Sequence, residues 1–128
     1  MDTHCFLWSA FSPEKLSKTV RSILLDGDND IFVSAVSFWE ISLKYAIGKL
    51  ELEGVEPSEL IDVAESMGFE IVSLGASESA SFYRLPVGGH RDPFDRMLIW
   101  QTVNSEKVLI SKDIKFSEYK QYGLKVIW

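Results

Sequence analysis

Short runs of β-branched and other apolar residues alternate with helical patterns along the whole chain, and this alternation limits the fold more than any other feature. It is typical of a parallel sheet whose strands are connected by helices. No internal repeat, low-complexity tract or interdomain linker interrupts it, so we expect residues 1–128 to form a single α/β domain. The strands are predicted at 31–35, 71–74, 108–110 and 124–128, and the helices at 13–25, 37–47, 58–67, 78–84, 93–104 and, as a short element, 116–119.

Cysteine usage and hydropathy bear on the cellular compartment. The single cysteine, Cys5, cannot form an internal disulfide and offers no zinc-binding spacing, which suits a reducing compartment. The sequence contains no apolar stretch of about 18 residues, and its start lacks the basic segment and apolar run of a signal peptide. We therefore expect a cytoplasmic protein that does not span a membrane.

Four acidic residues from distant parts of the chain are expected at one edge of the sheet. In parallel α/β sheets, functional groups collect beyond the carboxyl ends of the strands. Asp113 follows one predicted strand, and Glu40 lies in the first turn of the helix after another. Asp95 lies in the first turn of the helix that precedes the third strand, and Asp2 stands where a further strand would end. The pattern predicts that these four carboxylates converge.

Carboxylates that crowd together in a partly buried site repel one another, so such a site favours cations that compensate their charge. Carboxylate oxygens are the ligands that Mg²⁺ and Mn²⁺ prefer. Two such ions can activate a water and stabilise the leaving oxygen when a phosphodiester bond is cleaved. Binding of two Mg²⁺ would change the net charge from −6 to −2, so the acidic composition does not exclude a nucleic-acid substrate.

Four segments, in chain order, resemble the motifs of the PIN-domain ribonucleases and, among them, of the VapC-type toxins. They are Asp2-Thr3-His4 with Phe6-Leu7-Trp8, the stretch from Val33 to Ile41 around Glu40, His90-Arg91-Asp92-Pro93-Phe94-Asp95-Arg96-Met97-Leu98-Ile99, and Leu109-Ile110-Ser111-Lys112-Asp113 with Phe116. The resemblance covers nearly the whole chain. It implies a PIN-like three-layer α/β/α fold with a central, mainly parallel sheet.

The resemblance also implies an activity and the residues that carry it. Members of this family are Mg²⁺- or Mn²⁺-dependent ribonucleases that cleave RNA, usually as homodimers, and a cognate antitoxin protein neutralises them. By this resemblance, the catalytic and metal-binding residues are Asp2, Glu40, Asp95 and Asp113. The hydroxyls of Ser37 and Ser111 would support these ligands.

Residues beside the third and fourth motifs have more than one possible role. Asp92 precedes Pro93 at a predicted helix start, so its simplest role is to cap that helix by accepting the backbone N–H of Phe94 or Asp95, with support of the metal site as the alternative. Candidates for contact with substrate phosphates are His90, Arg91, Arg96 and Lys112. The alternative for each is an ordinary solvated position.

The start of the sequence departs from the family pattern. Family members carry an apolar run ahead of the first acid, and this run forms the central strand, whereas here Met1 directly precedes Asp2. The first strand is therefore expected to be truncated, which uncovers backbone groups and apolar surface on the two neighbouring strands. We expect a gap or a substitute strand there, with Asp2 anchored on one side only and metal binding weakened.

Other interpretations stay open at this point. Glu40 and Lys44 stand four residues apart on one predicted helix, so an exposed ion pair is an alternative to a metal role for Glu40. A catalytically impaired PIN module with a binding role only, or a Mg²⁺-binding receiver-like regulatory domain, would use the same acids differently. Trp8, Phe38 and Trp39 predict the surface on which a second copy or an antitoxin would bind.

Overall fold

A computed structural model describes all residues, 1–128, and contains two separate pairs of parallel strands. Strand β1 (Phe32–Ser34) pairs with β2 (Glu70–Val72), and β3 (Val108–Ile110) pairs with β4 (Lys125–Ile127). In the registers, Val33 lies opposite Ile71, and Leu109 lies opposite Val126. The predicted parallel pairing and the four predicted strands are thus confirmed.

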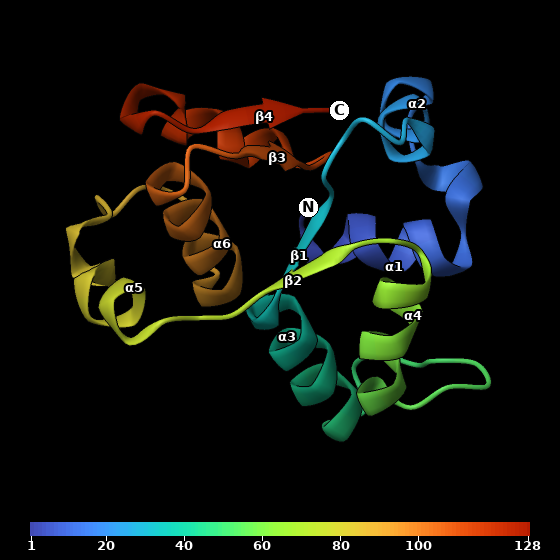
Figure 1. The fold of residues 1–128 in the computed structure, drawn as a ribbon. Helices are drawn as coiled ribbons and strands as arrows, with labels where there is room; N and C mark the ends of the chain where they lie inside the picture. Colours follow the sequence, from blue (N-terminus) through green and yellow to red (C-terminus); the bar gives the residue numbers. More distant parts are fainter.

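Helices surround the strands, as Figure 1 shows. Helix α3 contacts β1, and α4 contacts β2. Helix α6 contacts β3, and β4 packs against the 3₁₀ segment η4. The α-helices are α1 (Thr3–Phe11), α2 (Lys18–Leu25), α3 (Ala35–Ala46), α4 (Leu60–Ser66), α5 (Ala76–Ser81) and α6 (Pro93–Asn104). The 3₁₀ segments are η1 (Pro13–Lys15), η2 (Pro57–Glu59), η3 (Phe82–Arg84) and η4 (Ile114–Tyr122).

Two local expectations near the N-terminus are wrong. The helix predicted at 13–25 is broken into η1 and α2, because the Ser17 hydroxyl accepts the backbone N–H of Val20 and starts a new helix. The predicted helices begin at residue 13, whereas Thr3–Phe11 also form a helix, α1. Asp2 caps this helix by accepting the backbone N–H of Cys5 at 2.8 Å.

The hydrophobic core consists of three clusters that follow the division of the strands. The first joins α1, β1, α3 and α4 and contains Phe6, Ile31, Val33, Ile41, Leu60, Ala64 and Phe69. The second joins α6, β3 and η4 and contains Leu85, Ile99, Leu109, Phe116, Tyr119 and Leu124. The third, between them, contains Cys5, Leu16, Val20 and Ile110. Met1 packs against the first and third clusters, so it connects these two clusters.

The expected gap lies between β1 and β3. A cavity of about 500 Å³ is lined by residues of both strands, by Met1 and by α6. At its end, the Met1 amine donates to the Phe32 carbonyl at 3.0 Å, and the Asp2 backbone N–H donates to the Ile110 carbonyl at 2.9 Å. Burial lowers the pKa of that amine. Met1 thus bonds to β1 and Asp2 to β3, so the backbone of Asp2 itself bonds to one of the two strands.

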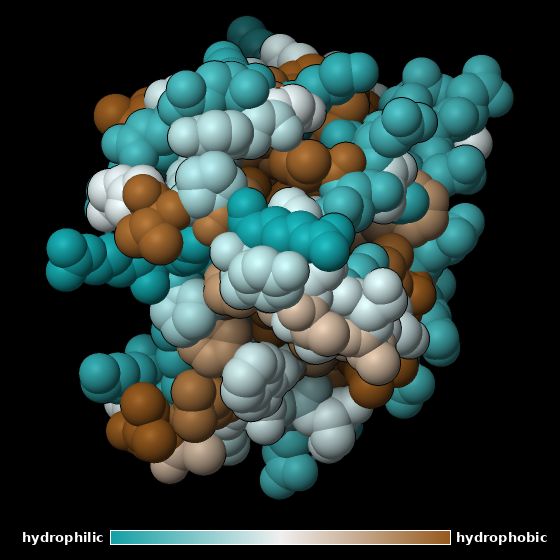
Figure 2. Space-filling model, turned by 90° about the vertical axis from the view of Figure 1, so that its left-hand side faces the viewer, coloured by the Kyte–Doolittle hydropathy of each residue, from teal (hydrophilic) through white to brown (hydrophobic).

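No helix in the structure is both long enough and apolar enough to cross a bilayer. On the face of the molecule that Figure 2 presents, hydrophobic residues lie in separate patches among hydrophilic ones.

Candidate metal site

The start of helix α6 positions Asp95, one of the four predicted metal ligands. The Asp92 carboxylate accepts the backbone N–H groups of Phe94 at 2.9 Å and of Asp95 at 3.2 Å, and Pro93 occupies the first helical position. This confirms the predicted capping role of Asp92. Because the helix begins here, Asp95 lies in its first turn and faces the end of β3.

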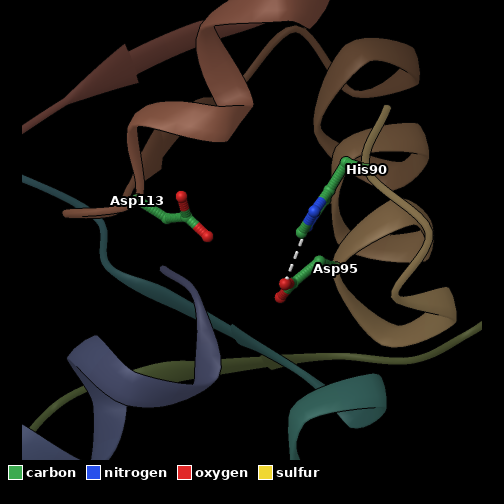
Figure 3. Close-up of side chains that lie close together, drawn as sticks. All are labelled: His90, Asp95 and Asp113. Carbon is green, nitrogen blue, oxygen red and sulfur yellow. Dashed lines mark hydrogen bonds and ion pairs between the residues drawn. The ribbon is translucent and has the colours of Figure 1, made fainter. Parts of the chain in front are cut away.

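A histidine and two aspartates meet at the carboxyl end of β3. His90 Nε2 lies 2.9 Å from Asp95 Oδ2, and one ligand atom from each of His90, Asp95 and Asp113 lies within 4.8 Å of the others. Figure 3 shows the three side chains pointing into one space, from the loop before α6, from α6 itself and from the segment after β3. The oxygen and nitrogen atoms of this group are those that bind divalent cations.

The acids crowd one another enough to change the protonation of Asp95. Burial, followed by the negative charge of Asp92, raises the pKa of Asp95 to about 6. The charge of Glu40 acts in the same direction, whereas the hydrogen bond from His90 opposes it. A bound cation would relieve this repulsion, so the electrostatics of the site fit a divalent ion.

Glu40 is buried at the base of the site and is held by two neighbours. Its side chain accepts a 2.7 Å hydrogen bond from the Thr3 hydroxyl and forms an ion pair with Lys44. The Thr3 hydroxyl also lies 3.0 Å from that of Ser37. Burial alone would lower the pKa of Lys44, but the hydrogen bond and charge of Glu40 raise it overall. The ion pair that we considered as an alternative is therefore present, although Glu40 is almost fully buried rather than exposed.

Asp2 and Asp113 line a second, open cavity of about 300 Å³ together with His4, Trp8 and Lys112. The Ser111 hydroxyl accepts the backbone N–H of Asp113 at 3.0 Å and so fixes the turn that carries this acid. Asp113 in turn caps η4 through the backbone N–H of Lys115. Through Asp113, this cavity adjoins the group formed by His90 and Asp95.

The four residues expected to contact phosphates lie in different environments. Arg91 and Lys112 are exposed, and the Lys112 Nζ lies 5.9 Å from the ring centres of both Trp8 and Trp128. His90 is buried and faces Asp95.

The prediction that Arg96 contacts a substrate phosphate is wrong, because this residue is buried and does not face the acids. Its guanidinium donates to the carbonyls of Leu85 and Pro86, both at 3.1 Å, and to the Tyr119 hydroxyl at 2.9 Å. It stabilises the loop before α6 instead of offering donors to a phosphate.

Two residues of the site were not assigned their roles from the sequence. Thr3 was predicted to belong to the first motif but was given no role of its own, although its hydroxyl connects Glu40 with Ser37. His90 was considered only as a phosphate contact. Its approach to Asp95 depends on the path of the loop, which no local pattern encodes.

Fold and site together define an α/β protein in which a histidine and two aspartates meet at the carboxyl edge of its parallel strands. The chain belongs to the PIN domain family, whose pattern matches residues 1–122. A search of curated proteins finds no match. Among solved structures, the fold is similar to VapBC2 from Rickettsia felis, which was crystallised bound to a DNA fragment from its promoter. The TM-score is 0.66 at 17% identity, and the similarity covers 98% of this chain and 93% of the other.

Proposed function

We propose that this protein is a divalent-metal-dependent endoribonuclease and the toxin of a toxin–antitoxin pair. The observation that carries the proposal is the meeting of His90, Asp95 and Asp113 within 4.8 Å, beside Glu40 and Asp2, in a chain of the PIN domain family. The similarity in fold to a VapBC protein supports the toxin role. The receiver-like alternative is dropped because the family match is to a different fold.

In this proposal, the four acids Asp2, Glu40, Asp95 and Asp113 hold Mg²⁺ or Mn²⁺. The bound metal supplies an activated water and stabilises the leaving oxygen of a phosphodiester. Ser37 and Ser111 keep their neighbours in place through the hydrogen bonds described above, and Asp92 holds the first turn of α6. Glu40 must exchange its Lys44 partner for the cation before it can act as a ligand.

Substrate contacts are proposed for the exposed cations beside the acids. Arg91 lies next to the loop that carries His90, and Lys112 directly precedes Asp113. Because both side chains are exposed, both can contact a substrate phosphate. Neutralising either residue should weaken RNA binding and reduce its dependence on salt.

The test of activity uses the purified chain and a single-stranded RNA. We expect cleavage with Mg²⁺ or Mn²⁺, none in EDTA, and none for the Asp95→Asn, Asp113→Asn double variant. Glu65→Gln, which neutralises an exposed carboxylate on α4, is the matched control and should cleave normally. Metal-dependent cleavage by the pure double variant would refute the proposed site.

Antitoxin binding and a homodimer are proposed together with a cytoplasmic location. An exposed apolar stripe along α3 and its C-cap residue supports a protein interface: Trp39, Leu43 and Ile47 follow one another at four-residue spacing and are 58%, 41% and 56% exposed. Of the three aromatics that we expected in an interface, Trp39 is the one most exposed. Light scattering of the purified chain tests the dimer, and relief of growth arrest by co-expression of a candidate antitoxin tests the pairing.

The Lys44–Glu40 ion pair favours one alternative, an impaired PIN module that only binds a partner. Titration with Mn²⁺ separates the two functions. Binding weaker than about 1 mM would favour the impaired module, because the ion would then be too weakly held at ordinary concentrations.

A further inference from the structure

His90 is held so that its ring faces the acids and not the solvent. The residue is 8% exposed, and its ring packs edge-to-face against Phe116 with the ring centres 5.5 Å apart and the planes at 88°. Its backbone carbonyl accepts a hydrogen bond from the Tyr119 hydroxyl at 3.4 Å. The ring and the backbone of His90 are therefore both fixed by η4, with Nε2 directed at Asp95.

The spacing of the three side chains suits a single ion. Ligands on opposite sides of a small divalent cation, with bonds of about 2.1 Å, lie about 4.2 Å apart. Adjacent ligands on such an ion lie about 3.0 Å apart, which matches the 2.9 Å between His90 Nε2 and Asp95 Oδ2. The Asp113 ligand atom lies within 4.8 Å of both, so a movement of this side chain toward them would bring all three onto one ion. The Asp95 and Asp113 side chains are partly exposed at the cavity and have room for this movement.

Two other roles for His90 compete with ligation. A phosphate contact requires access to solvent, which the burial of His90 denies and which the neighbouring Arg91 has. A hydrogen bond that only positions Asp95 matches the 2.9 Å contact. Nε2 nevertheless lies close to the carboxylates of both Asp95 and Asp113. A cation held by these carboxylates would therefore compete with Asp95 for this nitrogen.

We propose that His90 Nε2 binds the divalent ion directly, together with Asp95 and Asp113, and that the site consequently prefers Mn²⁺ or another first-row transition ion to Mg²⁺. This inference rests on the metal-dependent function proposed above. Imidazole nitrogen is a good ligand for first-row transition ions, whereas Mg²⁺ favours oxygen ligands and retains its waters. One nitrogen in an otherwise carboxylate site therefore changes which ion binds.

The test is pulsed electron paramagnetic resonance of the full chain loaded with Mn²⁺. A directly bound nitrogen modulates the Mn²⁺ spin echo, and a histidine that only donates a hydrogen bond to Asp95 does not produce this strong coupling. The chain has two histidines, and His4, which is exposed and lines the cavity with Asp2 and Asp113, is the alternative source of nitrogen. We expect the ¹⁴N signal in the unmodified protein and in His4→Gln, and its loss in His90→Gln.

Calorimetric titration gives the second readout. In His90→Gln, the Mn²⁺ affinity should fall by about tenfold or more. The Mg²⁺ affinity should change by less than about threefold, because an oxygen of glutamine can replace the lost nitrogen for Mg²⁺. Thermal unfolding of both histidine variants shows whether each is folded.

Labelling the unmodified protein with ¹⁵N-histidine makes the result independent of any substitution, since the echo modulation must change from the ¹⁴N to the ¹⁵N pattern. Mn²⁺ binding without nitrogen coupling, or coupling that disappears in His4→Gln, overturns the role of His90 but leaves the proposed nuclease intact. Absence of Mn²⁺ binding together with absence of RNA cleavage overturns both.

Discussion

Replacing Asp95 with asparagine should stabilise the metal-free protein at neutral pH, although it removes a carboxylate from the proposed site. Burial and the charge of Asp92 raise the pKa of Asp95 from 3.8 to about 6 in the folded state. The folded protein thus holds this proton more tightly than the unfolded chain. The favourable contribution is present below about pH 4 and is lost as the pH rises through 6.

At pH 7 the difference between the folded and unfolded pKa values of Asp95 lowers the free energy of unfolding by about 3 kcal/mol. Asparagine carries no charge, and its carbonyl can still accept the hydrogen bond from His90. Since a chain of 128 residues unfolds with an entropy of about 2.1 cal/mol/K per residue, the melting temperature should rise by about 10 °C. The charge of Asp95 thus lowers the stability of the metal-free protein, as is common for crowded acids in functional sites.

The measurement is urea unfolding of the original chain and of Asp95→Asn in EDTA, at pH 7 and at pH 4. We expect a difference of about 3 kcal/mol at pH 7 that becomes small at pH 4, where both carry a neutral side chain. Glu65→Gln changes the net charge equally but on an exposed helix surface, and should show no comparable difference. An Asp95→Asn protein that is less stable than the original at pH 7 would refute the reasoning. Saturating Mn²⁺ at about 100 times its Kd should stabilise only the original chain, by about 2.7 kcal/mol.

Three further predictions follow from particular contacts. Asp92→Ala removes the cap of α6 and should lower the unfolding free energy by about 1 kcal/mol, measured by urea denaturation, with Asp92→Ser recovering most of the loss. Arg96→Gln removes the donors to the buried Leu85 carbonyl and to the Pro86 carbonyl and should cost about 2 kcal/mol, detected as early hydrogen exchange in residues 85–92. An apolar segment of about four residues added ahead of Met1 should fill the cavity between β1 and β3 and raise stability by about 2–4 kcal/mol, whereas a Gly/Ser segment of equal length should not.

Much of the fold was predictable because its signals are local. The bounds of α6 match the prediction at both ends, since Asp92 and Pro93 form an unambiguous helix start. The break between η1 and α2 was missed because the apolar spacing continues across it, and the Ser17 cap outweighs that spacing. Helix α1 was missed because its apolar residues lie on more than one side, toward two different core clusters.

The approach of Asp95 and Asp113 to one another could be predicted from the sequence, but not all partners of the acids could. Asp113 follows a strand and Asp95 lies in the first turn of a helix, and the sheet topology brings such positions together, whereas Glu40 lies further along α3, which begins at Ala35. The lysine that pairs with Glu40 is four residues away on the same helix, so it was foreseen. The hydroxyl of Thr3, in contrast, reaches Glu40 from 37 residues away, and only the packing of α1 against α3 creates this contact.

Arg96 shows why two neighbouring residues of one sequence motif can have different roles. It is adjacent to Asp95 on α6, yet successive residues of a helix point about 100° apart, so one faces the acids and the other faces the loop. There Arg96 binds the Tyr119 hydroxyl, which in turn donates to the carbonyl of His90. The arginine that we first assigned to a phosphate therefore acts on His90 through Tyr119. Its positive charge and its three donors fix the residue that, in our proposal, determines which ion binds.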